Sequence, residues 1–263
     1  MKYFLLFLTP VFIFNCNSSS GPITIFTDEL PAIKQQIVSS EKFNDQSWQY
    51  FLQHLPVKKG IVVDYNGNAV ANQMKQDGIV QFDVGKADLQ QCADALMRIR
   101  AEYLFSQKRY DEIGFHFVNG HYYSYDDYCI GLRVMPAGKS LTFVSLDPCF
   151  KTHETLRKYL NIVYCYASTI SLAKELKKTN EFAIGTVVIH PGSPGHCFII
   201  VDEAPDSAGN KVFKLVEGYS PAQSIYVLSN LEEPQISPWY HLTKGTITTS
   251  SCRFIDYQMG KFE

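Results

Sequence analysis

Apolar positions recur along this chain with the period of a helix in three segments. The clearest segment follows Asp88, a suitable N-cap, and its apolar side chains over residues 89–103 share one helical face. Thr152 is the expected cap of a second long helix, and Pro56 ends a shorter one. The pattern therefore predicts helices over residues 48–55, 89–103 and 153–178.

Shorter apolar or alternating runs, bounded by Gly, Pro and Asn, have the pattern of strands. These runs cover residues 61–65, 79–84, 113–118, 130–134, 141–146, 182–189, 196–201, 211–216 and 224–228. Helices mixed with runs of antiparallel strands are typical of an α+β fold. Because the sequence has no internal repeat or linker, we expect one α+β domain over residues 47–263.

The first residues have a different pattern, which bears on the localisation of the protein. Lys2 precedes an apolar run over residues 3–14, and a membrane-spanning helix would need roughly 20 such residues. Residues 1–15 therefore have the pattern of a secretory signal peptide. Cys16 follows directly, and the stretch 13–16 resembles a bacterial lipobox, in which the Cys after the cleaved bond carries a lipid. Asn15 stands where a small residue is usual.

A lipid on Cys16 would make this an exported protein anchored to a bacterial membrane, in the periplasm or at the outer surface. Residues 16–46 would then form the lipid attachment site and a flexible lead-in to the domain. Plain secretion, with Cys16 as a chance cysteine, is the alternative.

Charge and composition exclude some classes of partner. The formal net charge is −2, and the 24 Lys and Arg residues are scattered, so the sequence has no basic patch for a nucleic acid. Aromatic residues make up 14% of the chain, which suits either a groove for a glycan or peptide or an aromatic core. Since no His or Cys spacing matches a zinc site, we expect neither a metal nor a cofactor.

The remaining six cysteines can form disulfides outside the cytoplasm. Spacing alone does not choose among the connectivities of Cys92, Cys129, Cys149, Cys165, Cys197 and Cys252.

One histidine stands where a catalytic base is expected. His196 opens a strand directly after a loop rich in Gly and Pro, and such element ends face a cleft more often than a core. Cys197 then points to the opposite face of the strand, so it is a poor partner for this His. Folding the predicted hairpin about residues 206–207 brings Glu217 roughly opposite His196. A carboxylate there would fix the imidazole tautomer and favour its protonated form.

Cys92 is the candidate nucleophile because it lies nearest the start of the clearest predicted helix. The helix dipole and the unpaired N–H groups of a helix N-terminus stabilise a thiolate, and the same groups can bind an oxyanion. Cys92 also lies on the apolar face of this helix, where a cysteine commonly serves as a small buried hydrophobic residue. Spacing alone leaves both interpretations open.

A Cys at the head of a helix, followed by an antiparallel sheet that bears a His, resembles the papain-like fold. The arrangement is most similar to the bacterial NlpC/P60 cell-wall amidases. Gly-Thr at 185–186 and Gly-His at 195–196 stand where those enzymes have a Gly-Asp pair and a Gly-His loop. Gln-Cys-Ala-Asp at 91–94 departs from their nucleophile signature. The resemblance implies Cys92 as nucleophile, His196 as base and Glu217 as the orienting residue.

A longer and more specific set of motifs resembles the bacterial family of domain of unknown function 4846, over about residues 47–242. These motifs are Asp-Leu-Gln-Gln-Cys-Ala-Asp-Ala at 88–95 with Arg98 and residues 100–104, Gly-Ser-Pro-Gly-His at 192–196, Tyr219, Pro-Ala-Gln at 221–223 and Ser-Pro-Trp-Tyr at 237–240. The resemblance implies an exported protein and brings no established activity. An amide is expected in many relatives at the position of Glu217, which makes Gln223 and Tyr219 the alternative orienting residues.

Other polar residues have structural interpretations. Arg98 and Glu102 are four apart and are expected to pair on the helix surface. Arg100, at the edge of the apolar stripe, is expected to bond a carboxylate or carbonyl. His190 is expected in a loop rather than as a second base. The remaining histidines have no partner spacing: His54, His116, His121, His153 and His241.

Two functions of different class follow from these patterns. The first is a lipid-anchored cysteine hydrolase or acyltransferase of the bacterial envelope that acts on an amide or ester, with peptidoglycan peptides as the natural substrate. The second is a non-catalytic envelope lipoprotein that binds a glycan, peptide or protein partner and keeps Cys92 buried.

Overall fold

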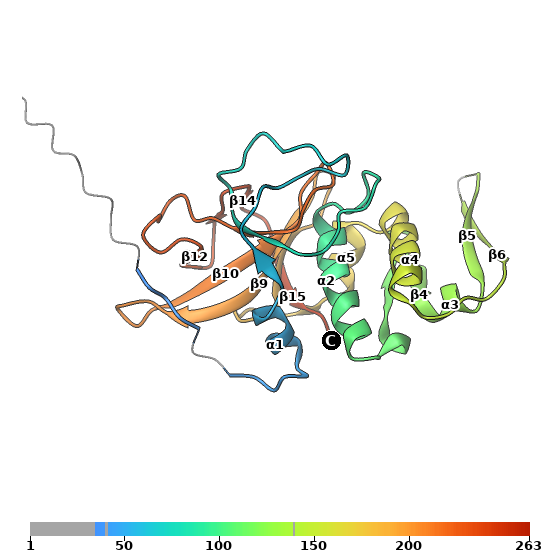
Figure 1. Ribbon diagram of the computed structural model, residues 1–263, viewed down its shortest axis with the longest axis horizontal. Coiled ribbons are helices and arrows are strands. Elements are labelled where there is room, and N and C mark those ends of the chain that lie inside the picture. The colour runs from blue at the N-terminus through green and yellow to red at the C-terminus, as the bar shows by residue number, and fades with distance from the viewer. Residues whose placement is uncertain (1–34, 40–41, 139) are drawn as a thin grey trace, which may run out of the picture. The chain divides into compact units, whose positions relative to one another are not determined.

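Helices and antiparallel strands alternate along the chain in the computed structural model, which describes residues 35–39, 42–138 and 140–263 (Figure 1). The expected α+β class is therefore confirmed. The expected signal peptide and Cys16 lie outside the described residues. Within the described part of the chain, no helix has both the length and the apolar character needed to cross a membrane.

The main sheet is antiparallel at every pair of neighbouring strands. Its strands follow the order β1-β2-β11-β10-β9-β8-β15-β7, and β12 also pairs with β10. Their bounds are β1 (Val57–Lys58), β2 (Gln76–Val80), β7 (Lys177–Lys178), β8 (Thr186–His190), β9 (His196–Pro205), β10 (Lys211–Glu217), β11 (Tyr226–Leu228), β12 (Trp239–Tyr240) and β15 (Gln258–Lys261).

Smaller hairpins and the helices complete the fold. The paired strands are β3 (Gly114–His116) with β4 (Tyr122–Ser124), β5 (Leu132–Ala137) with β6 (Ser140–Ser145), and β13 (Ile247–Thr248) with β14 (Arg253–Phe254). The helices are α1 (Trp48–Gln53), α2 (Cys92–Ser106), α3 (Tyr125–Cys129), α4 (His153–Tyr166) and α5 (Thr169–Glu175), with a short 3-10 turn at Tyr110–Glu112. In Figure 1, α2 lies between the sheet and α4.

Strand β9 links the two halves of the core because its alternate side chains enter different clusters. Cys197 and Ile199 pack in the cluster that contains the apolar side chains of α2. Phe198 and Ile200 pack in the cluster on the other side of the sheet. The candidate base at the start of β9 is thus anchored by a strand that is buried on both faces.

The head of α2 differs from the sequence prediction. The helix begins at Cys92 with Gln91 as N-cap, so the predicted N-cap, Asp88, is wrong. The Asp88 carboxylate instead accepts hydrogen bonds from the backbone N–H of Ala222 at 2.7 Å and from the Gln91 side chain at 3.0 Å. These bonds tie the loop before α2 to the segment after β10, and they make Cys92 the first helical residue.

The second predicted helix is two helices. Thr152 caps α4 as expected, but Ala167 is extended and Ser168 caps a new helix, α5, by accepting a hydrogen bond from the N–H of Ile170 at 3.1 Å. The apolar periodicity continues across this break, which is why the pattern did not reveal it. The predicted strand at 61–65 is wrong as well, because only isolated bridges form there.

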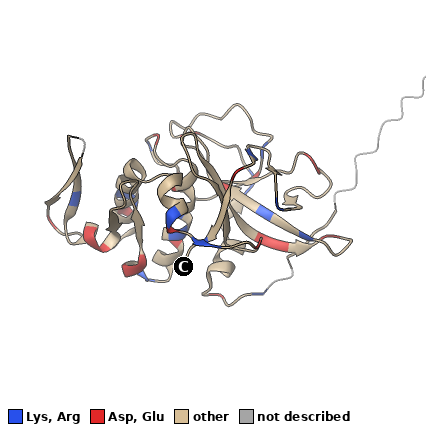
Figure 2. Cartoon of the chain, turned by 180° about the vertical axis from the view of Figure 1, so that it is seen from behind, with Lys and Arg blue, Asp and Glu red and all other residues tan. Residues whose placement is uncertain are grey.

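Charged residues on α2 are also placed differently from expectation. Arg98 and Glu102 do pair, at 2.5 Å, but they are 2% and 5% exposed, so the predicted surface pair is wrong. Neighbouring elements cover this helix nearly all round, and its residues from Ala93 to Leu104 are buried. Arg100 donates to the backbone oxygen of Glu263, the kind of structural bond that was predicted. Figure 2 shows both signs of charge on helices and strands alike.

Three of the described histidines have carboxylate partners that local spacing did not reveal. His116 lies 3.6 Å from Glu175. His241 lies between Asp206 at 3.0 Å and Glu233 at 2.9 Å, and His153 lies 2.7 Å from Glu102. Asp206 belongs to the turn between β9 and β10, and Glu102 is on another helix than His153, so only the tertiary fold brings these pairs together.

Candidate active site

Cys92 is a free, half-buried thiol at the first residue of α2. Its sulfur lies 3.8 Å from the backbone oxygen of Gly195, in the loop before β9. The first N–H groups of a helix have no partner inside the helix, so they point outward beside this thiol. Close packing holds the end of β10 against the same helix head: a Cβ on Gly218 would lie 2.5 Å from that of Ala95.

His196 is the first residue of β9 and pairs in the sheet with His190, the last residue of β8. The loop between them is fastened to the head of α5, because Thr169 Oγ1 and the backbone of Gly192 lie within hydrogen-bond distance, 3.3 Å. A Cβ on Gly195 would overlap Thr169 Oγ1, so glycine is needed there. The extended residue between α4 and α5 thus allows the N-terminus of α5 to hold the loop that precedes His196.

Glu217 is completely buried at the end of β10, and its carboxylate reaches His196. Its Oε2 lies 2.8 Å from His196 Nε2 and accepts a second hydrogen bond, at 2.8 Å, from Ser251. Its Oε1 accepts the hydroxyl of Tyr226 at 2.5 Å. The register pairs Val216 with Ile199, so Glu217 reaches His196 diagonally rather than from directly opposite.

The charges around His196 favour its protonated form. Burial alone would lower the pKa of His196, but interactions with Cys92 and Glu217 raise that pKa to about 10. Because Nε2 is bonded to Glu217, Nδ1 is the ring nitrogen left for the thiol. Burial and the negative charge of Glu217 raise the pKa of Tyr226, which keeps its hydroxyl as a donor to the carboxylate.

Three residues around Glu217 were not found from the sequence: Tyr226, Ser251 and Lys75. Lys75 is buried with its ammonium 3.7 Å from the centre of the Tyr219 ring. Burial lowers the pKa of Lys75, and the charge of Glu217 opposes this shift. These residues lie in separate segments with no shared periodicity, so no local signal points to them.

The alternative orienting residues lie elsewhere around the site. Tyr219 packs its ring edge-on against the imidazole of His196, with 5.3 Å between ring centroids. Gln223 is buried, and its side-chain nitrogen has no hydrogen-bond partner in the described part of the chain. Of the three candidate orienting residues, Glu217 is therefore the one that lies within hydrogen-bond distance of a ring nitrogen of His196, Nε2.

Two cavities meet at Cys92. The larger, of about 500 Å³, is lined by His196 and by apolar side chains such as Tyr219 and Ile255. The smaller, of about 320 Å³, is lined mainly by polar residues from the heads of α2 and α5. Both include Cys92, Pro194, Gly195 and Ser220 in their walls. Cys92 therefore lies in the wall that the two cavities share.

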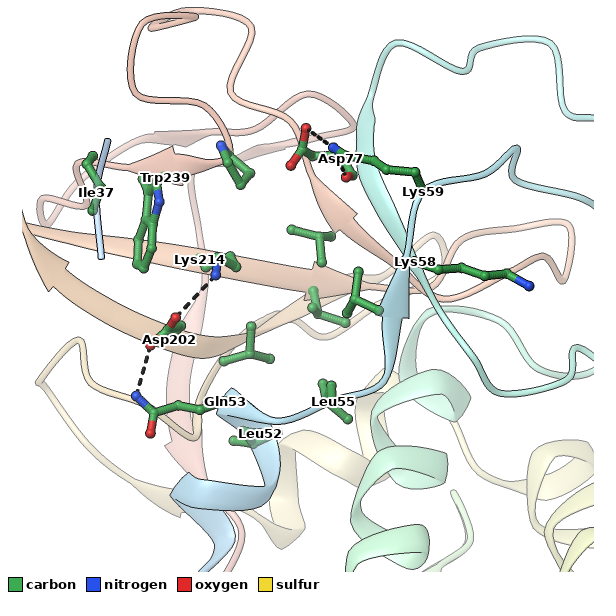
Figure 3. Close-up of a pocket in the computed structure, with 15 residues that line it drawn as sticks. Ile37, Leu52, Gln53, Leu55, Lys58, Lys59, Asp77, Asp202, Lys214 and Trp239 are labelled. Atoms are coloured by element: carbon green, nitrogen blue, oxygen red, sulfur yellow. Dashed lines mark hydrogen bonds and ion pairs between the residues drawn. The ribbon is translucent and has the colours of Figure 1, made fainter. Parts of the chain in front are cut away.

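A separate cavity of about 410 Å³ lies over β9 and β10, next to the end of α1 (Figure 3). Four of the charged side chains in its wall form two pairs, Lys214 with Asp202 at 3.2 Å and Lys59 with Asp77 at 2.8 Å. None of the described residues in its wall is a Cys, Ser or His. The described part of its wall thus lacks the thiol and imidazole that line the larger cavity at Cys92.

A family model covers nearly all of the described chain, matching residues 36–261. The chain belongs to the family described as domain of unknown function 4846. The DUF4846 segment contains Cys92, His196 and Glu217, as well as the residues that hold them in place. No curated protein and no solved structure matches the chain.

Proposed function

We propose that this protein is a lipid-anchored cysteine hydrolase or acyltransferase of the bacterial envelope, which acts on an amide or ester. The observation that carries this proposal is that Cys92 and His196 line the same cavity, while Nε2 of His196 lies 2.8 Å from the carboxylate of the buried Glu217. A Cys at a helix head, a His at the start of an antiparallel strand and an orienting residue on the next strand support a papain-like arrangement. Such a series contains a nucleophile, a base and an orienting group.

In the first step the Cys92 sulfur, as thiolate, attacks the substrate carbonyl carbon and a C–S bond forms. The carbonyl oxygen becomes an oxyanion beside the N–H groups at the head of α2. The C–N or C–O bond of the substrate then breaks. The proton on His196 Nδ1 passes to the leaving nitrogen or oxygen, which departs as an amine or alcohol.

In the second step a water molecule attacks the thioester carbon. His196, now neutral, accepts a proton from that water, and the C–S bond breaks to release a carboxylic acid and the thiolate. An amine or alcohol in place of water gives acyl transfer. Throughout, Glu217 holds the ring through Nε2, which leaves Nδ1 to exchange protons with the reacting groups.

The pattern of the first 16 residues supports localisation to the cell envelope, because a signal peptide and a lipid on Cys16 would place the domain beside the cell wall. Peptidoglycan peptides contain amide bonds and lie in that compartment. They are therefore the substrate class we propose for this site.

Alkylation by iodoacetamide, followed by peptide mapping, tests the proposed pair. Cys92 should be modified faster than Cys165 at about pH 6, although Cys165 is exposed, because the proposed base His196 lines the same cavity as Cys92. Burial and the nearby Asp94 raise the pKa of Cys165, which makes it an internal control. His196→Ala should slow the modification of Cys92 about tenfold and leave Cys165 unchanged.

The opposite pattern of alkylation rates would contradict the proposed function. If Cys92 reacts slowly at every pH in the folded protein and His196→Ala changes nothing, Cys92 is only a buried hydrophobic residue. The non-catalytic binding lipoprotein would then be the better interpretation.

A further inference from the structure

The smaller cavity beside Cys92 has two polar side chains without partners in its wall. Asp94, at the third position of α2, is 7% exposed, and its Oδ2 accepts a hydrogen bond from the N–H of Gln91 at 3.1 Å. Its Oδ1 has no hydrogen-bond partner in the described part of the chain. Tyr164 of α4 is 6% exposed, and its hydroxyl lacks a partner there as well. Both residues line this cavity.

Unpaired buried polar atoms are rare in folded proteins and call for an explanation. Here two of them, one from α2 and one from α4, belong to residues that share the wall of a single cavity next to the proposed nucleophile. A ligand group that donates several hydrogen bonds would satisfy both oxygens at once.

The charge of the cavity wall indicates the sign of that group. The wall includes a second carboxylate, Asp88, and none of the described residues that line it is Lys, Arg or His. Burial raises the pKa of Asp94 to about 8, and the hydrogen bond from the N–H of Gln91 opposes this shift. A primary ammonium carries three N–H donors and one positive charge, so it would supply what Asp94 and Tyr164 lack.

The position of His196 indicates which part of a substrate occupies this cavity. His196 lines the larger cavity and is absent from the described wall of the smaller one. Since His196 protonates the leaving group in the proposed mechanism, the leaving group lies in the larger cavity. The acyl part of the substrate, joined to Cys92 in the thioester, therefore lies in the smaller cavity.

We infer that the smaller cavity binds a free amino group on the acyl part of the substrate, as an ammonium that donates to Asp94 Oδ1 and to the Tyr164 oxygen. This inference rests on the proposed function and narrows it. The preferred substrates are amides or esters of amino acids, or of peptides whose free N-terminus lies next to the scissile bond.

Two electrophiles that differ only at this amine test the inference. Alanyl chloromethyl ketone and its N-acetyl derivative both alkylate a thiol, with formation of a C–S bond and loss of chloride. The second-order rate of modification, mapped to Cys92, should be at least about tenfold higher for the free amine in the wild-type protein. Iodoacetamide, which has no amine, reports the reactivity of Cys92 itself.

Asp94→Asn and Tyr164→Phe should each reduce the preference for the free amine while leaving the iodoacetamide rate of Cys92 unchanged. Tyr164→Phe removes only an unpaired hydroxyl, so the variant should fold with an unchanged or higher thermal midpoint even if Asp94→Asn does not fold. Asp127→Asn is the matched control, because Asp127 occupies the same third helical position in α3 and accepts from the N–H of Ser124 at 3.2 Å.

The outcomes separate the inference from the proposed function. Equal rates with the two chloromethyl ketones, together with rapid modification by iodoacetamide, would overturn the amine site and leave the nucleophile standing. A preference that Tyr164→Phe and a folded Asp94→Asn both leave intact would also overturn the assignment. If no electrophile modifies Cys92 in the folded protein, the proposed function fails and the inference fails with it.

Discussion

Replacing Glu217 by Gln would remove one negative charge from the centre of the candidate site and largely preserve the shape of the side chain. The buried carboxylate accepts hydrogen bonds from His196, Tyr226 and Ser251. An amide can still accept the bond from His196, but it stabilises an imidazolium far less than a carboxylate does. The substitution should therefore lower the pKa of His196, since burial would then be opposed mainly by Cys92.

The effect on stability has a definite sign and size. The pKa of His196 is raised from an ordinary 6.5 to about 10, so the folded state binds this proton more tightly than the unfolded state. The stabilisation is fully present below the unfolded pKa and is lost as pH rises toward the folded pKa. At about 1.4 kcal/mol per pKa unit, deprotonation of His196 lowers the free energy of unfolding by roughly 3 kcal/mol between about pH 6.5 and pH 9. A variant that retains half of the shift would lose only about 2 kcal/mol over the same range.

Urea unfolding of the wild-type protein and of Glu217→Gln over this pH range measures the difference. Titrating groups far from Glu217 contribute equally to both proteins, so they cancel in the comparison. The pKa of Lys75 should fall further in the variant, because the charge of Glu217 no longer opposes the effect of burial. Glu203→Gln is a matched control, because Glu203 is also a buried carboxylate but pairs with Lys211, at 2.8 Å, and with no histidine. Its stability difference from the wild type should stay constant across the range.

The reasoning would be refuted by parallel curves. If the wild-type protein and Glu217→Gln lose the same free energy of unfolding between about pH 6.5 and pH 9, Glu217 does not set the charge of His196. Glu217 could then not act as the orienting carboxylate of the site.

Three further predictions concern other parts of the chain. Cys16→Ala should release the protein from the membrane fraction, and unchanged retention would contradict the lipid anchor. Mapping of the non-reduced protein should find Cys92 as a free thiol, and any disulfide among the other cysteines. Cys129 and Cys149 are candidates for such a disulfide, because the backbone N–H of Cys149 donates to the carbonyl of Cys129 at 2.8 Å. Cys92 in a disulfide would remove it as the nucleophile. Arg98→Met should cost about 1.5–3 kcal/mol of unfolding free energy, because the buried Glu102 loses this partner and keeps His153. Arg109→Met at an exposed pair should cost at most about 1 kcal/mol. Equal losses would show that the Arg98 pair is no more important than a surface pair.

Periodicity predicted the elements best where one apolar face continues without interruption. The strand predicted at 196–201 appears as β9, which continues to Pro205, and the strand predicted at 211–216 appears as β10, which ends one residue later at Glu217. The boundary between α4 and α5 was missed because Ser168 interrupts the backbone without interrupting the apolar face. The head of α2 was misplaced because the bond of Asp88 to Ala222 depends on a segment far along the chain.

The candidate site shows the same division between local and tertiary information. Reflecting the hairpin between β9 and β10 predicted that Glu217 lies near His196, because that relation depends only on strand register. Burial of Arg98 depends on which elements cover α2, and the surroundings of Glu217 depend on three separate segments. No spacing along the sequence encodes either of these, so both required the tertiary structure.

The energetic cost of the buried charges bears on the choice between hydrolase and binding lipoprotein. A carboxylate taken fully out of water is expensive to keep, and apolar residues of similar volume are commonly at least as stabilising. Here Glu217 is completely buried and pairs with a His that also interacts with a free thiol at a helix head, where two cavities meet. A binding surface requires the cavities but has no use for a nucleophile, a base and a buried carboxylate in series. Perturbed titratable groups arranged in this way are characteristic of catalytic sites, which favours the proposed hydrolase or acyltransferase.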